Sequence, residues 1–337
     1  MSGVRFAQLE PTTRCNFTCG FCCGRQMPQE DLAWDQFVAT VDALPDLTHV
    51  ELQGEGESLL HPRFHDMVAW LRQRSIKVSF ISNGSLLSER HIASLLEAGV
   101  EKISVSIESP DPDDFRRIRG GKLEKVIRNL EALMAARRAA SLDRPVVGFS
   151  VTVLASTRKQ LPAIYALYRR LGLDGGITLQ PLQAMDSYAR HYDDTVAHEE
   201  LDAAAADGIF ARFFSDRQLR RIQAERSPVR GFYEELMDGW KPGERTCPYL
   251  EQGLYVNRTG HVTACCMIKD TDRHGLGRIG ETPLPDMLSR REAMRAELAA
   301  GGVPEPCAGC SLVRFARMGR GELMWFGLRG LWQAAVG

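Results

Sequence analysis

The chain has 337 residues and a formal net charge of −1, with 44% hydrophobic and 25% charged residues. It is longer than one typical domain, its composition is that of an ordinary globular protein, and its charge gives no electrostatic case for a nucleic-acid partner. We find no signal-peptide pattern at the start and no run of about 20 apolar residues that could form a transmembrane helix. Nine reduced cysteines then favour the cytoplasm, with no membrane and no nucleic acid as partners.

Residues 4–181 alternate between short apolar segments, typical of strands, and longer segments with one apolar face, typical of helices. The expected strands cover 4–10, 48–53, 77–82, 100–108, 145–154 and 176–182, and the expected helices cover 34–44, 61–73, 88–99, 123–134 and 161–172. Ser88 is the expected N-cap of the helix over 88–99, Gly99 its expected end, and Asn83-Gly84 predicts a turn. The alternation predicts an α/β fold with a parallel sheet. Six units are two fewer than a full (β/α)8 barrel contains, so we expect a partial (β/α)6 barrel.

Changes in composition divide the chain into three parts. We expect the partial barrel at 1–189, a polar, Ala-rich helical connector at 190–246, and a second, α+β unit at 247–337. In the second unit, the segment "GLYVNRTGHVTACC" predicts a hairpin with its turn at 257–260, and a helix follows over 285–299. The apolar tail "ELMWFGLRGLWQ" is expected to pack onto the body of the protein.

Three cysteines follow the first expected strand with the spacing C-x3-C-x2-C: Cys15, Cys19 and Cys22. Iron–sulfur cubanes usually have four thiolate ligands, so three thiolates leave one iron open to another molecule. The alternative is a zinc site, but zinc sites usually pair C-x2-C with a second pair, and none follows nearby. The spacing resembles the radical S-adenosylmethionine (radical SAM) superfamily. That resemblance implies that the open iron binds SAM and that the reduced cluster cleaves it to a 5′-deoxyadenosyl radical.

Later strand ends carry further motifs that resemble this superfamily. "LQGEGESLLHP" is similar to its Gly-Gly-Glu-Pro motif, with Gly56 and Glu57 matching and Ser58 in place of proline. The resemblance implies that Gly56 lets the backbone approach the methionyl group of SAM and that Glu57 accepts from its ammonium. "ISNG" and "SVSIES" resemble two more motifs near the SAM ribose and carboxylate, with Glu108 in place of the usual Asp. Arg119 resembles an arginine that holds the SAM carboxylate. The implied SAM-binding residues are Phe21, Gly56, Glu57, Ser82, Asn83, Ser106, Glu108, Arg119 and Leu182, the last against adenine.

A second group of cysteines lies in the C-terminal unit: Cys247, Cys265, Cys307 and Cys310. Its spacing resembles the twitch module, a shortened SPASM domain that holds one auxiliary [4Fe–4S] cluster; a zinc ribbon-like site is the alternative. The implied fold is a partial (β/α)6 radical SAM barrel with a C-terminal twitch- or SPASM-like α+β iron–sulfur module. Whether Cys265 or its neighbour is the ligand stays open. Cys23 and Cys266 remain unassigned, either as small buried hydrophobes or as catalytic thiols.

The resemblance implies an enzyme that abstracts a hydrogen atom from its substrate, with a fully ligated auxiliary cluster for electron transfer. We expect oxidation (dehydrogenation) or epimerisation of a polyol, amino sugar or similar biosynthetic metabolite, with oxidation slightly ahead. The alternatives are a maturase that epimerises or crosslinks a ribosomal peptide and, remotely, a non-enzymatic metal-binding scaffold. Few residues precede Cys15, so we expect no leader-peptide domain in cis, which favours a small substrate. Flavodoxin or ferredoxin is the expected reductant. Residues 188–192 follow the last barrel strand and form either part of a substrate pocket or a solvated helix start.

Overall fold

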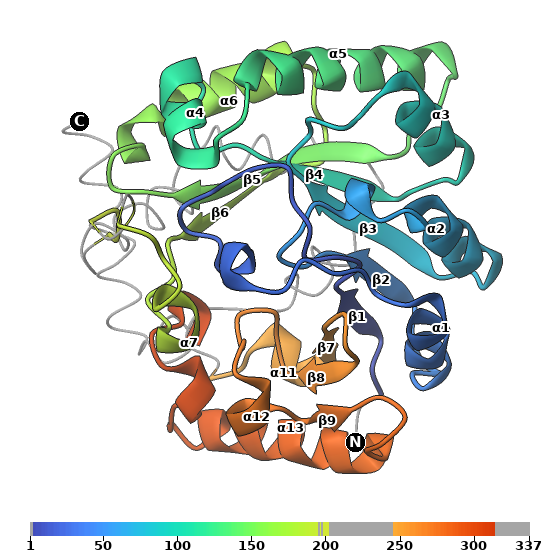
Figure 1. The fold of residues 1–337 in the computed structure, drawn as a ribbon, viewed down its shortest axis with the longest axis vertical. Coiled ribbons are helices and arrows are strands. Elements are labelled where there is room, and N and C mark those ends of the chain that lie inside the picture. The colour runs from blue at the N-terminus through green and yellow to red at the C-terminus, as the bar shows by residue number, and fades with distance from the viewer. Residues whose placement is uncertain (1–2, 195, 197, 202–244, 314–337) are drawn as a thin grey trace.

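The computed structural model describes residues 3–194, 196, 198–201 and 245–313. Six parallel strands lie side by side in chain order and curve into a partial barrel (Figure 1). They are β1 (Phe6–Leu9), β2 (His49–Leu52), β3 (Lys77–Ser82), β4 (Lys102–Ser106), β5 (Val146–Val153) and β6 (Ile177–Pro181). This confirms the predicted α/β fold class with its partial barrel.

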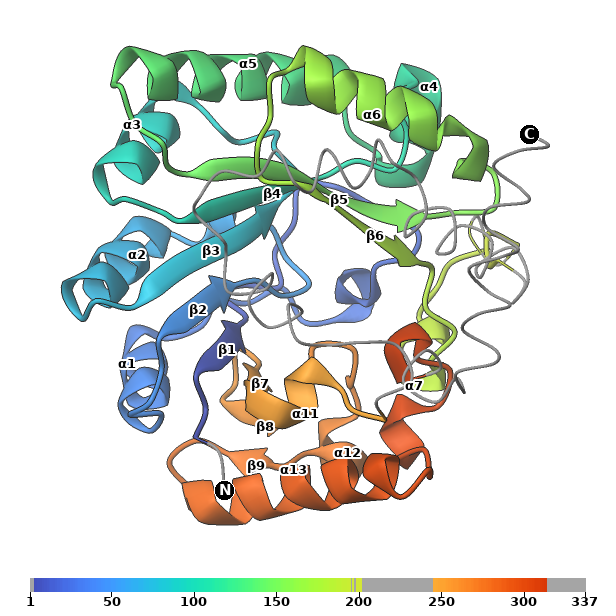
Figure 2. The same ribbon diagram turned by 180° about the vertical axis from the view of Figure 1, so that it is seen from behind.

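Helices cover the outer face of the curved sheet (Figures 1 and 2). They are α1 (Trp34–Asp42), α2 (Phe64–Gln73), α3 (Glu89–Glu97), α4 (Pro112–Arg119), α5 (Leu123–Ala139) and α6 (Leu161–Arg170), and the short α7 (Asp186–Ala189) follows β6. The sequence explains the bounds of α3, because the Ser88 hydroxyl accepts from the His91 N–H and Gly99 has φ +66°. Helix α4 was not predicted. Asp111 caps it, Pro112 occupies its first turn, and Gly120 ends it in the left-handed conformation.

The C-terminal module extends the barrel sheet instead of forming a sheet of its own. It contains α11 (Pro248–Gln252), β7 (Gly253–Val256), β8 (His261–Thr263), α12 (Thr271–His274), β9 (Gly277–Arg278) and α13 (Leu284–Ala299). Strand β7 runs parallel to β1, with Phe6 opposite Gly253 and Leu9 opposite Val256. Strands β7 and β8 form the predicted hairpin, and α13 is the predicted helix. The auxiliary cysteines are therefore tied to the first strand of the barrel.

The two faces of the barrel strands differ in polarity, because successive side chains point to opposite sides of a sheet. Side chains such as Ala7, Val50 and Val78 face the helices and are fully buried in the main hydrophobic core. The inward-facing positions are polar instead: Gln8, Glu51, Ser79, Lys102, Ser104, Ser150 and Thr178 line a cavity. Complete barrels of this general type fill their interior with branched apolar side chains. This interior is suited to polar contents.

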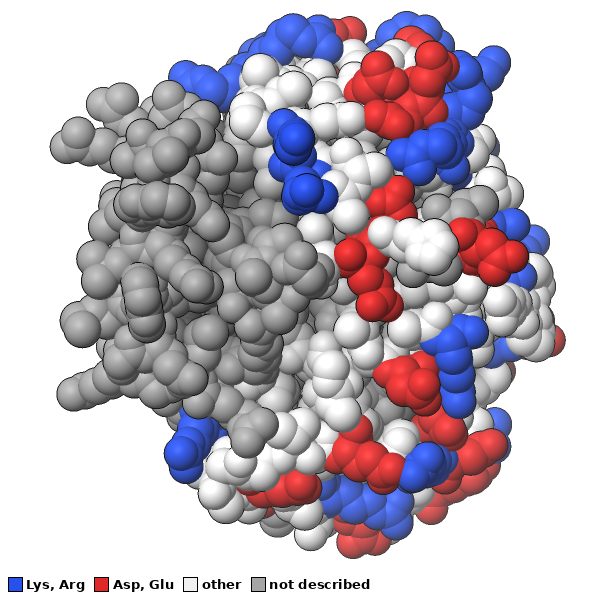
Figure 3. Space-filling view, turned by 90° about the vertical axis from the view of Figure 1, so that its left-hand side faces the viewer, with Lys and Arg blue, Asp and Glu red and all other residues white. Residues whose placement is uncertain are grey.

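Two predicted segments fall mainly outside the described residues. Most of the expected helical connector (202–244) and the apolar tail (314–337) belong to this undescribed part, so the predicted domain boundaries stay predictions. Within the described ranges, no helix combines the length and apolarity needed to cross a membrane. On the face shown in Figure 3, basic and acidic side chains occur side by side.

Candidate active site and cluster-binding residues

The loop that follows β1 gathers the first three cysteines around one cavity, which Cys15, Cys19 and Cys22 line together. Burial raises the pKa of all three thiols, that of Cys19 to about 11, and the charge of Arg119 acts in the opposite direction on Cys15 and Cys19. Metal ligands have to be thiolates, so iron must displace these protons when it binds. Three thiols around one cavity fit a cubane that keeps one iron open.

The segment after β2 packs its backbone directly against the cysteine loop. A Cβ atom added to Gly56 would lie 2.3 Å from the carbonyl oxygen of Thr12 and 2.6 Å from that of Arg14, so a glycine is required here. The Glu57 N–H donates to the same Arg14 carbonyl at 2.9 Å. The predicted Gly-Glu motif therefore holds in place the loop that carries the cysteines.

The carboxylate of Glu57 is buried and already bound by the protein. Its Oε1 accepts from the Ser82 hydroxyl at 2.8 Å, and its Oε2 accepts from the Asn83 N–H at 2.6 Å. The Leu59 N–H is a third donor, at 3.4 Å. Burial raises the pKa of Glu57, and these hydrogen bonds oppose that shift. A carboxylate offers about four lone-pair sites, so one remains for the SAM ammonium, and that contact stays a prediction.

Asn83 connects the end of β3 to the cysteine loop. Its Nδ2 donates to Asn16 Oδ1 at 2.9 Å and lies 3.9 Å from Cys15 Sγ. The structure thus brings Ser82 and Asn83 to the cluster cavity from the strand end where the sequence predicted them. Ser106 ends β4 and is partly exposed.

A buried ion pair lies beside Cys19. Arg119 donates to both carboxylate oxygens of Glu108, with 2.9 Å between Nη2 and Oε1. Burial opposes the charged form of Arg119, but the Glu108 carboxylate and the neighbouring thiols raise its pKa above the ordinary value. Because both oxygens of Glu108 are engaged, this residue orients Arg119. A contact between Glu108 and the SAM ribose stays a prediction.

A small apolar cluster adjoins this ion pair. Ile118, Leu154 and Leu182 form it, and Phe21 packs against it. The guanidinium carbon of Arg119 lies 5.8 Å from the centre of the Phe21 ring. Phe21 and Leu182, two of the predicted SAM-binding residues, therefore share one apolar surface.

The second cysteine group lines a different cavity, between the barrel interior and the C-terminal module. Cys247, Cys265, Cys307 and Cys310 all contribute to its wall. Burial raises the pKa of Cys247 to about 12, and the charge of Cys310 adds to this shift. No three His, Cys, Asp or Glu side chains of the described ranges gather closely enough to hold a single metal ion. The fit to a four-thiolate cluster therefore rests on the four thiols that line this one cavity.

The two adjacent cysteines after β8 have different neighbours. The charges that act on Cys265 come from Cys266 and from the other three cysteines of the group. Burial raises the pKa of Cys266 to about 12, and the charged groups that act on it are Lys269, Glu55 and Glu51. This arrangement favours Cys265 as the cluster ligand and leaves Cys266 turned toward the barrel.

The unassigned cysteines differ in their access to the cavity. Cys266 lines the cavity beside the auxiliary cysteines. Cys23 is 1% exposed and bonds to Glu55, and burial raises its pKa far above the ordinary value. Of these two candidate catalytic thiols, Cys266 is the one that could contact a molecule bound in this cavity.

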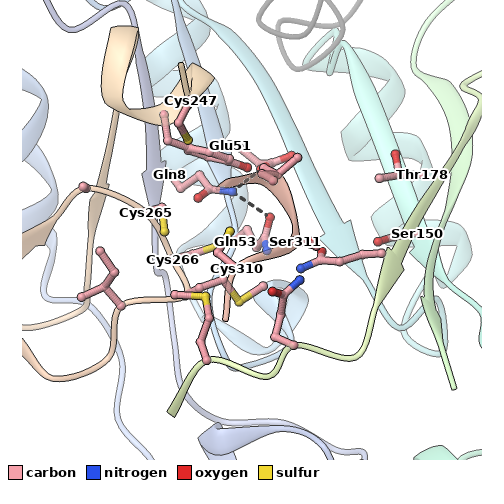
Figure 4. Close-up of a pocket in the computed structure, with 18 of the residues that line it drawn as sticks. Gln8, Glu51, Gln53, Ser150, Thr178, Cys247, Cys265, Cys266, Cys310 and Ser311 are labelled. Carbon is pink, nitrogen blue, oxygen red and sulfur yellow. Dashed lines mark hydrogen bonds between the residues drawn. The ribbon is translucent and has the colours of Figure 1, made fainter. Parts of the chain in front are cut away.

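Figure 4 shows this cavity, with Cys247, Cys265, Cys266 and Cys310 on one side and Ser150 and Thr178 on the opposite side. In this cavity Gln8 connects β1 to β2 and the residue after it, because its Nε2 donates to Glu51 Oε2 at 2.8 Å and to Gln53 Oε1 at 3.2 Å. No sequence motif marked these residues as part of the site. The alternation of polar residues along β1 and β2 was the available signal. Short strands with one face on an apolar core show the same alternation, so the pattern does not distinguish the two cases.

A second buried ion pair, also missed in the sequence, connects the two cysteine-bearing segments. Lys269 Nζ lies 2.5 Å from Glu55 Oε1, and the Tyr188 hydroxyl donates to Glu55 Oε2 at 3.0 Å. Burial alone would raise the pKa of Glu55, yet Lys269 brings it below its ordinary value. Burial likewise opposes the charge of Lys269, but Glu55 keeps the pKa of Lys269 well above normal.

The segment after β6 contacts the cluster loop and the C-terminal module. Besides the Tyr188 bond, the Tyr192 hydroxyl donates to the Gln183 carbonyl at 2.8 Å, and His191 Nδ1 lies 3.1 Å from Gln26 Oε1. Arg190 pairs with Asp270 at 3.7 Å. Tyr188 and Arg190 thus contact the C-terminal module, while His191 and Tyr192 bond within the barrel unit. These contacts do not support a direct role in substrate binding, which is one of the two interpretations of this segment.

Comparison with known proteins identifies relatives over most of the chain. The chain is 27% identical over 335 residues to the tungsten-containing aldehyde ferredoxin oxidoreductase cofactor-modifying protein of Pyrococcus furiosus, covering 92% of this chain and 88% of that protein. It is 30% identical over 190 residues to the GTP 3',8-cyclase of Rhodopseudomonas palustris, covering 52% of each.

Solved structures share the fold. SuiB of Streptococcus suis, bound to the precursor peptide SuiA, aligns with a TM-score of 0.67 and 13% identity, over 94% of this chain and 71% of that one. Native anSMEcpe with bound AdoMet aligns with a TM-score of 0.65 and 15% identity, over 93% of this chain and 88% of that one. At these identities the likeness concerns the fold alone.

Two family models match the two cysteine-bearing segments separately. The model of the radical SAM superfamily matches residues 9–165, and the SPASM model, an iron–sulfur cluster-binding domain, matches residues 247–311. These domains use SAM and [4Fe–4S] clusters, and the cavities described above contain the thiols for one open and one fully ligated cluster. The chain is thus a member of the radical SAM superfamily with a C-terminal SPASM-type domain.

Proposed function

We propose that this radical SAM enzyme oxidises a small polar metabolite, such as a polyol or an amino sugar, in the cavity between the barrel interior and the C-terminal module. The observation that carries the proposal is the cavity itself, which has polar barrel strands on one side and the auxiliary cysteines on the other. Cys15, Cys19 and Cys22 would hold the SAM-binding cluster, and Cys247, Cys265, Cys307 and Cys310 the auxiliary one. When bound, SAM and the reduced cluster supply a 5′-deoxyadenosyl radical that takes a hydrogen atom from the substrate.

The chain's own residues would bind and orient the substrate through hydrogen bonds. The Oε1 atoms of Gln8 and Gln183 are buried and lack a hydrogen-bond partner within the described part of the chain, and both residues line the cavity. A buried polar atom without a partner costs about 1–3 kcal/mol, so a ligand that donates to these atoms recovers that energy. Glu51, Ser150 and Thr178 add a carboxylate and two hydroxyls to the same wall. This lining supports a ligand with several hydroxyl or amino groups.

The names of the relatives also support a small polar substrate. One is named for the modification of an enzyme cofactor and the other for the cyclisation of GTP. The SuiB title names a precursor peptide, but that likeness concerns the fold alone. Peptide maturation therefore remains the alternative.

Oxidation and epimerisation place different demands on the cavity. An epimerase has to return a hydrogen atom to the substrate, and Cys266 is a thiol that lines the cavity. An enzyme that oxidises its substrate has to remove an electron and a proton from the substrate radical, after the hydrogen atom has been abstracted. We place oxidation ahead because the auxiliary cysteines line the same cavity, so a cluster bound there would lie next to the substrate as an electron acceptor.

The test uses anaerobically reconstituted protein with SAM, dithionite and either the polar metabolites or the peptides of the source cells, in D2O. We expect 5′-deoxyadenosine and a product of the metabolite fraction that is lighter than its precursor by two hydrogens, without deuterium gain. The Cys15→Ala/Cys19→Ala/Cys22→Ala variant should form neither, while Cys23→Ala should behave like the wild type.

Other results would overturn the proposal. A product of unchanged skeleton that gains one deuterium, and that Cys266→Ala no longer forms, would establish epimerisation instead. A product found in the peptide fraction would establish a maturase. Undiminished 5′-deoxyadenosine formation by the triple cysteine variant would remove the assignment of the SAM-binding cluster to this loop.

A further inference from the structure

The ion pair between Glu55 and Lys269 joins three segments that are distant in sequence. Glu55 follows β2, Tyr188 belongs to α7, and Lys269 follows the auxiliary cysteines Cys265 and Cys266. The side chains of Lys269 and Glu55 are 5% and 8% exposed, so both charges lie away from water. Lys269 Nζ also lies 4.8 Å from the centre of the Tyr255 ring. Removal of one partner of such a buried pair strongly destabilises the folded protein, because the other charge is left uncompensated.

Glu55 directly contacts a ligand of the SAM-binding cluster. The Cys22 thiol donates to Glu55 Oε2, with 3.4 Å between sulfur and oxygen. Iron binds cysteine as the thiolate, which has no proton to donate. In the loaded protein the Glu55 carboxylate therefore faces a negatively charged ligand. Glu10 adds a further carboxylate nearby, because its Oε1 accepts from the Glu55 N–H at 3.0 Å.

We propose that Lys269, supplied by the C-terminal module, is a positioning residue of the SAM-binding cluster and sets its reduction potential through Glu55. The net charge around an iron–sulfur cluster is one of the factors that fix its potential. With the ammonium in place, Glu55 and Lys269 together carry no net charge beside Cys22. Without it, the carboxylate would oppose the electron that the cluster has to accept. The C-terminal module would thus adjust the chemistry of a cluster that it does not bind.

The test is a redox titration of the reconstituted protein without substrate, followed by electron paramagnetic resonance, so it does not depend on the proposed reaction. SAM changes the signal of the cluster that binds it, which separates this cluster from the auxiliary one. Three variants give a sign pattern: Lys269→Met leaves Glu55 uncompensated, Glu55→Gln leaves Lys269 uncompensated, and the double variant removes both charges. Arg273→Met is the matched control, because it removes a cation from the same segment at an exposed ion pair with Glu305.

We expect the potential to become more negative in Lys269→Met and more positive in Glu55→Gln, and to return toward the wild-type value in the double variant. A roughly tenfold change in the ratio of reduced to oxidised cluster corresponds to about 59 mV for a one-electron couple, well within the resolution of the method. Arg273→Met should match the wild type, and Lys269→Arg should stay close to it because the charge is kept.

Two results would overturn the proposal. One is an unchanged potential in a cluster-loaded Lys269→Met variant. The other is a double variant that shifts as far as Lys269→Met, since packing and not charge would then be responsible. If Lys269→Met fails to fold or to load its cluster, Glu55→Gln decides: a shift to a more positive potential supports the proposal, and no shift refutes it.

Discussion

Glu57 combines a buried charge with three internal hydrogen bonds, and so it connects the loop after β2 to the end of β3. Gly56, next to it, brings the same backbone within contact of the cysteine loop. Resemblance implied that Glu57 binds SAM. The structure adds that the same carboxylate stabilises the site where SAM would bind. A change at Glu57 is therefore expected to affect both the stability of the fold and the affinity for SAM.

The change Glu57→Gln tests this double role. Glutamine keeps the shape but replaces one oxygen by an NH2 group, so either the Ser82 hydroxyl or the Asn83 N–H loses its acceptor. We expect a loss of about 1–3 kcal/mol in the free energy of unfolding, measured by denaturant titration. If Glu57 also accepts from the SAM ammonium, the affinity for SAM falls roughly ten- to hundred-fold, measured by equilibrium binding.

The control is Glu131→Gln, which alters an exposed carboxylate paired with Arg170 and should change neither quantity. An unchanged dissociation constant for SAM in a folded, cluster-loaded Glu57→Gln protein would exclude the ammonium contact and leave the bracing role alone.

Strand β7 is the element that decides whether the C-terminal module is independent. It pairs with β1 along four residues of each strand, and Leu254 at its centre is fully buried in the main core. A module that shares a sheet and a core with the barrel is expected to unfold together with it.

The change Leu254→Ala should therefore destabilise the whole described unit. We expect a loss of about 2–5 kcal/mol, the usual cost of truncating a buried leucine, in one transition seen both by tryptophan fluorescence and by cluster absorbance. Leu142→Ala, at an exposed leucine, should have little effect. Two separate transitions, only one of them shifted, would contradict the shared-sheet interpretation.

Sequence patterns predicted most of these elements because their signals are local. The spacing of apolar residues and the Ser88 cap located α3, and the turn at 257–260 located the β7–β8 hairpin. Helix α4 also had a local signal, Asp111 followed by Pro112, but Phe115 and Ile118 are its only buried apolar residues, too few to reveal an apolar stripe in the sequence. The pairing of β1 with β7 had no local signal at all, because it depends on contacts between segments at opposite ends of the chain.

The same distinction explains which parts of the site could be predicted. The first three cluster cysteines lie close together in sequence, and the auxiliary four follow a recognisable spacing over a longer stretch, so the pattern alone was sufficient to propose both groups. Glu55 and Lys269 belong to different modules, and neither is unusual among its neighbours in sequence. Their significance comes from the 2.5 Å between them, which only the folded chain reveals.

At the scale of the whole molecule, the two cysteine groups predict two clusters per chain. We expect about eight irons in the reconstituted protein, as two cubanes. The Cys15→Ala/Cys19→Ala/Cys22→Ala variant should keep about four irons, because the auxiliary ligands are untouched. Cys265→Ala should lose the auxiliary cluster, while Cys266→Ala should keep both, since Cys265 is the one that neighbours the other three thiols.

Iron and zinc analysis together with Mössbauer spectroscopy measures these numbers. Stoichiometric zinc with a single cluster would contradict the auxiliary assignment. Loss of a cluster in Cys266→Ala but not in Cys265→Ala would exchange the roles of the two cysteines.

The pairing of β1 with β7 also has a consequence for the synthesis of the chain. Phe6 lies opposite Gly253, so β1 leaves the ribosome well before its second neighbour exists. At about 5–20 residues per second, the delay is roughly 12–50 s. During that time one edge of β1 exposes unpaired backbone groups, through which sheets tend to join other chains. A nascent chain that stops short of Cys247 thus has both an open sheet edge and only three of its seven proposed cluster ligands, which makes it a target for chaperones and proteases.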